Sequence, residues 1–393
     1  YKWVDWMKVL GIYLIIVGHF FPLGNQIIYM FSVPLFFFIS GFLSKTNETE
    51  KVFWSKLFRS LVLPLLIICF FIWCVILLEK LCDDESISTK SALLYWVMVM
   101  IGQQNGVTDF GGLGACWFIY TLILLKVVNH LVSKLYVKYL VLFTCVCVAS
   151  FFHVHEIKLY SAFADITVSY PFFFTGYIFQ KYYLVASKQL NIVSMLWKRI
   201  ILVIVVLFIV LFLLNKINGT PMVYRNEYGA DYLLFYCGGM IGTSIVFLLS
   251  SKLSFEYDSK IITTLSVGTI IILGFHGLFI DIIRYISDSW VHLYLGITSY
   301  FFAVLILFLF YPIIIVCSRY FSIILKKETR TSYTVKNAKV SLLFFVLGTL
   351  LAFFSRKIFL EELGNNFLGL TGTLNNILGL LNLAELGVGA AIS

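Results

Sequence analysis

The chain has 393 residues, of which 61% are hydrophobic and only 12% are charged, and its formal net charge is +9. This much apolar sequence excludes a soluble globular protein and indicates an all-α protein that crosses a membrane several times. Because the basic residues gather between the apolar segments, the positive charge indicates membrane topology and not binding to nucleic acid.

The first two apolar segments, 7–23 and 26–43, are joined by a turn, and each is long enough to cross a bilayer as a helix. The first contains two ionisable side chains, Lys8 and His19. Eleven residues make about three helical turns, so both side chains are expected on one helix face, roughly 16 Å apart along the axis. Ionisable groups at membrane depth are costly, so both are candidates for a functional site.

Nine further apolar segments follow along the chain. They span 60–78, 115–133, 139–153, 165–182, 200–214, 231–250, 262–283, 295–317 and 340–357. With the opening pair they predict ten to eleven transmembrane helices, although 139–153 and 200–214 are short for a full crossing. The segment 92–102 is too short to span and is expected either to lie along the membrane interface or to re-enter the membrane. We divide the chain into a transmembrane domain, residues 1–357, and a tail rich in Leu, Gly and Asn, residues 358–393, to which the sequence assigns no role.

Charge predicts the orientation of these helices. With the N-terminus placed in the cytoplasm, most of the 29 Lys and Arg residues fall in cytoplasmic segments, and most of the 20 acidic residues fall outside. Cytoplasmic loops are enriched in Lys and Arg, so this orientation is the predicted one. The eight cysteines lie mostly inside apolar segments and form no CxxC pair, so we expect neither a disulfide framework nor a metal site.

Several polar side chains are expected near the outer surface. In this topology His19 and His276 lie in the outer halves of their helices, and Asp165, Asp281 and Arg284 lie toward the same surface. These groups can meet in one outward-facing cavity, where a neutral histidine can take a proton from a hydroxyl as a general base. An ion pair at the membrane interface is the alternative for Asp281 and Arg284.

Basic side chains are expected near the inner surface. Lys56 and Arg59 are three residues apart, hence neighbours on one helix face just before the third apolar segment. Together with Lys8 they suit a phosphorylated ligand from the cytosol, although anchoring of the helix at the membrane surface is the simpler explanation of the pair taken alone. The sequence has no glycine-rich phosphate loop and no GxSxG or HExxH motif.

Six pieces of sequence occur in a familiar order. They are WVDWMKVLGIYLIIVGH at the start, FSVPLFFFISGFL, Lys56-x-x-Arg59 before Pro64, CWFIYTLILLK, PFFFTGYIFQK and GFHGLF. Over about residues 3–317 this order resembles the membrane acyltransferase-3 family, and above all its fucose 4-O-acetylase-like branch. Such proteins are helical bundles that take an acyl group from cytosolic acyl-CoA and deliver it to a sugar hydroxyl at the outer face.

The resemblance also implies roles for individual residues. It implies His19 as the catalytic histidine, Lys8, Lys56 and Arg59 near the phosphates of CoA, and Trp117 in the wall of the pore. The chain departs from the family pattern in two places. Lysines 8 and 56 stand where many members carry Arg, and FSVP stands where many carry FHMP, so the histidine of that motif is absent.

The predicted function is an O-acetyltransferase with several transmembrane helices in the bacterial cytoplasmic membrane. Acetyl-CoA is the expected acyl donor and a cell-surface or lipid-linked glycan the acceptor, with a homodimer left open. His19 is the expected general base and His276 a second catalytic residue. Acceptor binding is expected from Trp117, Asp165, Asp281 and Arg284.

Two alternatives stay open at the level of sequence. One is a transporter or flippase of lipid-linked sugar, in which the buried histidines and acids relay protons. No matching pair of inverted half-domains supports it. The other keeps the fold and transfers succinyl or another acyl group in place of acetyl.

Overall fold

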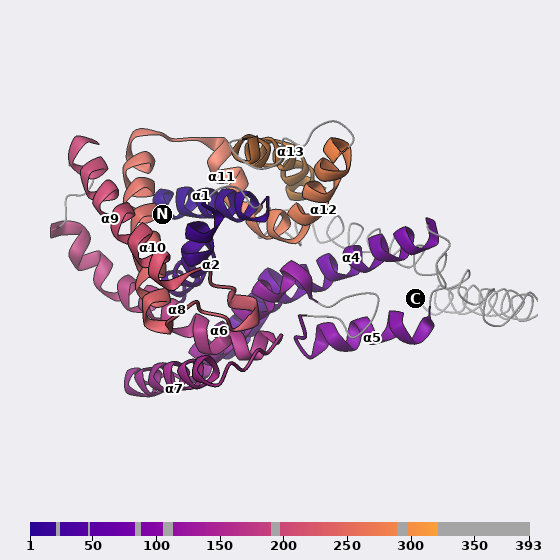
Figure 1. Cartoon of the computed structure of the whole chain (residues 1–393), viewed down its shortest axis with the longest axis horizontal. Helices are drawn as coiled ribbons and strands as arrows, with labels where there is room; N and C mark the ends of the chain where they lie inside the picture. Colours follow the sequence, from indigo (N-terminus) through magenta and orange to yellow (C-terminus); the bar gives the residue numbers. More distant parts are fainter. Residues whose placement is uncertain are drawn as a thin grey trace, which may run out of the picture. The chain divides into compact units, whose positions relative to one another are not determined.

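The computed structural model describes residues 1–20, 24–45, 48–82, 88–104, 113–189, 197–288 and 298–320 (Figure 1). Within these ranges the chain is helical and has no β-strand, so the all-α prediction is confirmed. The chain divides into two units, of which the first comprises Tyr1–Glu79 and Ser91–Glu328. The predicted helix 340–357 and the tail 358–393 belong to the second unit and lie outside the described residues.

The helices follow the predicted apolar segments closely. They are α1 (Lys2–His19), α2 (Asn25–Phe42), α3 (Glu50–Leu57), α4 (Leu63–Cys82), α5 (Thr89–Met100), α6 (Trp117–Leu131), α7 (Leu135–Val154), α8 (Ala162–Gln189), α9 (Trp197–Asn218), α10 (Tyr232–Glu256), α11 (Lys260–Val267), α12 (Thr269–Asp288) and α13 (Thr298–Tyr320). Short helical turns are η1 (Phe58–Val62), η2 (Gly114–Cys116) and η4 (Val223–Arg225). The helices α7 and α9 have 20 and 22 residues, so the expectation that these two segments are short for a crossing is wrong.

Seven described helical segments are long and apolar enough to cross a membrane. They are Asn25–Phe42, Glu50–Leu77, Gly114–Leu131, Leu135–Val154, Trp197–Asn218, Tyr232–Glu256 and Thr298–Arg319. The pair α11 and α12 is an eighth if it forms one span, although the two helices meet at a bend of 80°. The predicted count of ten to eleven therefore stays a prediction, as does the cytoplasmic N-terminus.

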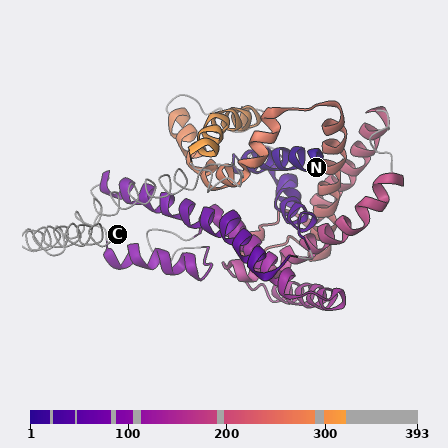
Figure 2. The same ribbon diagram turned by 180° about the vertical axis from the view of Figure 1, so that it is seen from behind.

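The helices α1 and α8 are absent from this set because they are less apolar than the others. Three charged residues, Lys2, Asp5 and Lys8, lie in α1. This helix packs against α2, α10, α11, α12 and α13, and α8 packs against α2, α6 and α7 (Figures 1 and 2). A helix that contacts mainly protein does not need the hydropathy of one that faces lipid. By contrast, only 17% of the apolar window of α9 is buried.

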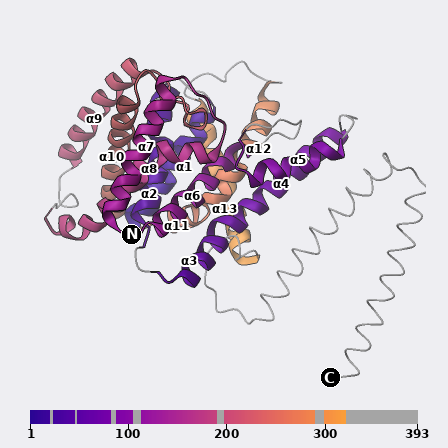
Figure 3. The ribbon, with the colours of Figure 1, turned by 90° about the horizontal axis from the view of Figure 1, so that it is seen from below.

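The helices α2 and α8 lie side by side in close contact (Figure 3). A methyl group added to Gly41 would overlap the carbonyl oxygen of Phe173, and one added to Gly176 would overlap that of Phe38. Each glycine thus lies directly against the backbone of the other helix. Small residues at such crossings let two membrane helices approach and gain van der Waals contact.

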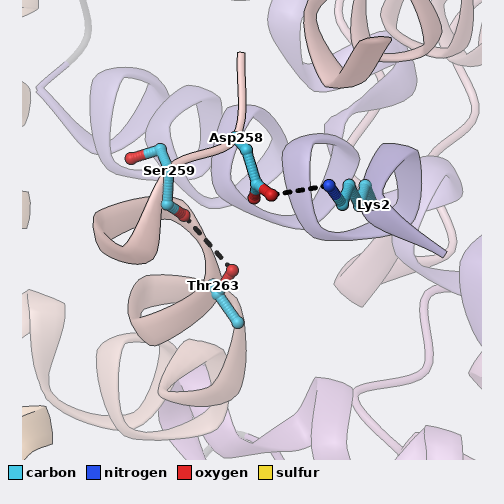
Figure 4. Close-up of polar contacts among 4 residues, drawn as sticks. All are labelled: Lys2, Asp258, Ser259 and Thr263. Atoms are coloured by element: carbon cyan, nitrogen blue, oxygen red, sulfur yellow. Dashed lines mark hydrogen bonds and ion pairs between the residues drawn. The ribbon is translucent and has the colours of Figure 1, made fainter.

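The N-terminal end of α1 is tied to α11. Lys2 Nζ lies 2.6 Å from a carboxylate oxygen of Asp258 (Figure 4). The side chain of Ser266 donates a hydrogen bond to Asp5. Ser259 caps α11 and accepts a hydrogen bond from the Thr263 hydroxyl at 3.2 Å through its carbonyl oxygen. These contacts fix α1 beside the broken pair α11–α12, which carries the second histidine of the candidate site.

Candidate active site

A cavity of about 320 Å³ lies at the His19 end of α1. Its walls come from α1, α2, α6, α12, the turn before residue 105 and the loop 219–231 between α9 and α10. The side chains that bear on chemistry are His19, Ser32, Gln104, Trp117, Tyr224 and His276. Three of the residues predicted for the site, His19, Trp117 and His276, are therefore brought together.

The two imidazoles lie side by side in this cavity. Their ring centroids are 4.9 Å apart and the ring planes are inclined by 43°. His19 ends α1 and is exposed, whereas His276 is only 2% exposed. A reactant in the cavity can therefore reach His19, while His276 is positioned behind it.

Backbone carbonyls determine the tautomer of His276. Its Nδ1 lies 2.8 Å from the carbonyl oxygen of Leu273 and 3.1 Å from that of Ile272. Because a carbonyl oxygen only accepts, Nδ1 carries the proton, and Nε2 of the neutral ring is left as an acceptor. This arrangement suits an imidazole that accepts a hydrogen bond and holds a neighbouring ring in place.

Gln104 lines the cavity and is joined to Asp165. The Gln104 amide donates from Nε2 to Asp165, while its backbone N–H donates to the carbonyl of Tyr160 at 2.9 Å. Gln104 is 5% exposed and Asp165 is fully buried. The preceding Gly102 has φ of +70°, which glycine adopts without strain. Asp165, which was predicted to bind the acceptor, does not line the cavity. Its hydrogen-bond partner Gln104 lies at the wall instead.

Aromatic side chains flank the imidazoles. Trp117 begins α6 and is half-buried, with its ring at 90° to that of Phe118. Tyr224 lies in η4, within the loop 219–231, and is also half-buried. Aromatic walls with a few polar groups are typical of pockets that bind small organic ligands.

The other predicted site residues lie elsewhere. Lys8 is half-buried on α1, and the uninterrupted helix confirms that it shares one helix with His19. Among the described residues, neither Lys8, Lys56 nor Arg59 lines the cavity. Asp281 is exposed on α12, and the side chain of Arg284 lies outside what the structure describes.

The two basic residues before the third apolar segment lie close to each other in the chain at an irregular turn. Lys56 lies in the last turn of α3 and pairs with Glu48 at 2.5 Å, while Arg59 is exposed in the π-helical turn η1. Pro64 cannot donate a backbone hydrogen bond, and its ring would clash with the carbonyl of the preceding turn of a regular helix. A wider turn relieves that clash, and such turns occur often at functional sites.

Metal ligands do not gather in the described part of the chain. No group of three or more His, Cys, Asp or Glu residues there is arranged to hold a metal ion. The groups that the described chain offers for chemistry in the cavity are the two imidazoles, the Gln104 amide and the aromatic rings.

Comparison with known families identifies the architecture. A family model described as an acyltransferase domain, that of the acyltransferase-3 family, matches residues 1–319. The chain belongs to the acyltransferase-3 family. Membership and the membrane-span helices together make it a membrane acyltransferase with several transmembrane helices. No curated protein and no solved structure matches it.

Within this acyltransferase, sequence reasoning missed three residues of the cavity. Ser32 is the residue of FSVP that stands at the histidine of the FHMP pattern, and it lines the cavity. Gln104 lies in a run of turn-forming residues, and Tyr224 follows another such run. These runs predict connections between helices, but not that a connection folds into the site.

Proposed function

We propose that the protein is an O-acetyltransferase that moves an acetyl group from acetyl-CoA to a hydroxyl of a cell-surface or lipid-linked glycan. The observation that supports this most is the accessible His19 beside the buried His276, in a cavity of a membrane acyltransferase. The cavity volume of about 320 Å³ is at the lower end of ligand pockets, which favours a short acyl group. The fucose 4-O-acetylase-like branch is part of the same proposal.

In the proposed reaction, the unprotonated nitrogen of His19 takes the proton of the acceptor hydroxyl. The hydroxyl oxygen attacks the carbonyl carbon of the thioester, and the bond from that carbon to sulfur then breaks. CoA leaves as a thiolate, to which His19 returns the proton. His276 Nε2 accepts a hydrogen bond from the other ring nitrogen of His19 and so acts through it, as a positioning residue.

The carbonyl oxygen of the thioester becomes negative during this attack and needs a donor. The Gln104 amide is a candidate, because Asp165 holds its nitrogen at the wall of the cavity. Donors fixed before the reaction stabilise a developing oxyanion without reorganisation. For the donor nucleotide we propose Lys8, Lys56 and Arg59, with a pantetheine arm that extends along α1 over the roughly 16 Å between Lys8 and His19.

Replacement of the base tests the reaction. We expect His19→Ala to lower acetyl transfer by about 10²–10⁴-fold, because a general base contributes rate of this order. The measurement is transfer of radiolabelled acetyl from acetyl-CoA to membrane glycan by the purified full chain. His155→Ala, an exposed histidine away from the cavity, is the matched control.

The thermal shift caused by CoA shows whether the variant still folds and binds the donor. If His19→Ala keeps that shift and transfers acetyl at the rate of the parent, the proposed role of His19 is wrong. If the parent itself moves no label to glycan, the acetyl-CoA proposal is wrong, and succinyl-CoA tests another acyl group.

One observation favours the transporter alternative. The 80° bend between α11 and α12 is a broken helix of the kind that lines substrate sites in transporters. A transporter of lipid-linked sugar would move its substrate across vesicles without acetyl-CoA and would leave no label on glycan. The family match favours acyl transfer.

A further inference from the structure

The loop 219–231 is a rigid wall of the cavity. Asn218 donates to the carbonyl of Tyr228 at 2.7 Å and accepts from the backbone N–H of Asp231 at 2.8 Å. Asn226 donates to the carbonyl of Leu159 at 2.8 Å and accepts from the Tyr228 hydroxyl at 2.9 Å. Side chains of the fold thus hold the loop before any ligand arrives.

Both acidic side chains of this loop have partners within the protein. Lys158 pairs with Glu227 at 2.8 Å, and the hydrogen bond and charge of this carboxylate raise the pKa of Lys158. Asp231 accepts two backbone N–H groups at the start of α10. The cation and both acids are therefore used by the fold itself.

Arg225 is the exception. Its guanidinium lies 5.1 Å from the ring centroid of Tyr224, a residue of the cavity wall. Arg225 is half-buried, and its Nε is buried without a hydrogen-bond partner in the described part of the chain. Nor does any described carboxylate lie within ion-pair distance of it. A desolvated donor of this kind destabilises the protein unless a partner satisfies it.

The stacking geometry leaves Arg225 ready for a ligand. A guanidinium on an aromatic ring uses the face of its plane, and its five N–H groups lie in that plane. The edge of the plane matches two oxygens of a carboxylate or a phosphate. The loop holds the Arg225 guanidinium beside Tyr224, a residue of the wall of the cavity that contains His19.

We propose that Arg225, stacked on Tyr224, is a subsite for an oxyanion of the acceptor. The ligand class is an anionic saccharide, in which the oxyanion is either a sugar carboxylate or the phosphate of a lipid-linked sugar. This inference rests on the proposed function, because it takes the cavity as the acceptor site. The subsite selects acceptors that carry a negative charge close to the hydroxyl that is acylated.

Anion binding by the purified full chain tests the subsite without acetyl-CoA. The probes are methyl β-D-glucuronide, glucose 6-phosphate and the neutral methyl β-D-glucoside, at equal ionic strength, and the readout is the thermal unfolding midpoint. At about ten times its Kd, a probe raises the midpoint of a chain of this length by roughly 1–2 °C. We expect such a rise for at least one anionic probe and a smaller one for the neutral glucoside.

Substitutions then assign the effect to Arg225. Arg225→Gln should bind the anion roughly tenfold more weakly, since a charge-assisted pair is lost. Arg225→Lys keeps the charge without the planar fork and should bind with intermediate strength. Lys158→Gln is the matched control, because it removes a cation that is already paired with Glu227 of this loop, and it should keep the shift of the parent.

The outcomes are distinct. A shift with glucuronide alone indicates a sugar carboxylate, a shift with the phosphate alone indicates a lipid-linked phosphate, and a shift with both indicates a general oxyanion site. Equal shifts in the parent and Arg225→Gln, or no preference of the parent for either anion, would overturn the proposal. Because no acyl donor is present, failure of acetyl transfer and failure of the anion site are read separately.

Discussion

Two histidines of the same chemical type differ in what the fold allows them to do. His19 is the last residue of its helix and faces an open cavity, whereas His276 is buried in the middle of α12 with Nδ1 bound to backbone carbonyls. Only an accessible imidazole can exchange a proton with a substrate hydroxyl. The tertiary environment, and not the residue type, therefore separates a candidate base from the residue that orients it.

Gln104 gives a prediction at this scale. If its amide donates only to the oxyanion of the transition state, Gln104→Ala should lower kcat by about 10²-fold and leave KM nearly unchanged. Asp165→Ala should also lower kcat and leave KM nearly unchanged, because Asp165 holds the Gln104 amide. Asp165→Asn keeps one side-chain oxygen that can accept this hydrogen bond, so its kcat should lie between those of the parent and Asp165→Ala. Steady-state kinetics of acetyl transfer measure this; a change in KM alone would instead indicate simple binding.

At the scale of elements, interior helices contact other helices closely, whereas the outer helices bury little of their apolar surface against protein. The glycines of the α2–α8 crossing bring two backbones into direct contact, and α1 is enclosed by five other helices. Neither α1 nor α8 passes a test of membrane spanning by hydropathy, because hydropathy reports what a helix faces and both face protein. The sequence predicted that the apolar segments are helices. It did not predict which helices lie inside the bundle and which lie at its periphery.

The crossing gives a second prediction. Gly176→Ala places a methyl group against the carbonyl of Phe38, so we expect a loss of about 1–3 kcal/mol of stability from overpacking. Gly277→Ala is the matched control, since nothing lies within 4 Å of the added methyl group, and it should stabilise α12 by roughly 0.5–1 kcal/mol. Thermal unfolding in one detergent compares them. Equal effects of the two changes would contradict the packing argument.

At the scale of the whole molecule, α10 separates two surfaces. Its start follows the loop 219–231, which pairs with Lys158, and its end leads to Asp258, which pairs with Lys2. With α10 as a membrane span, the N-terminus and the residues around 258 share one side of the membrane, and this topology predicts the loop at the cavity on the other side.

Chemical labelling checks the predicted orientation. In a variant without native cysteines, Lys158→Cys should react with a membrane-impermeant maleimide in intact cells, because the predicted orientation places the loop at the cavity outside. Lys260→Cys should react only after lysis, because the same orientation places it with the N-terminus in the cytoplasm. The reverse pattern would mean that the cavity opens to the cytosol.

By itself the sequence determined the class of fold, the series of apolar helices and the presence of Lys8 and His19 on one helix. These features depend on local composition and helical period, which a single segment carries. Only the tertiary structure decided that His276 lies beside His19, that Gln104 binds Asp165 at the cavity wall, and that Arg225, with no carboxylate partner among the described residues, lies beside the cavity residue Tyr224. Such contacts join residues more than fifty positions apart, and no local pattern encodes which helix packs against which.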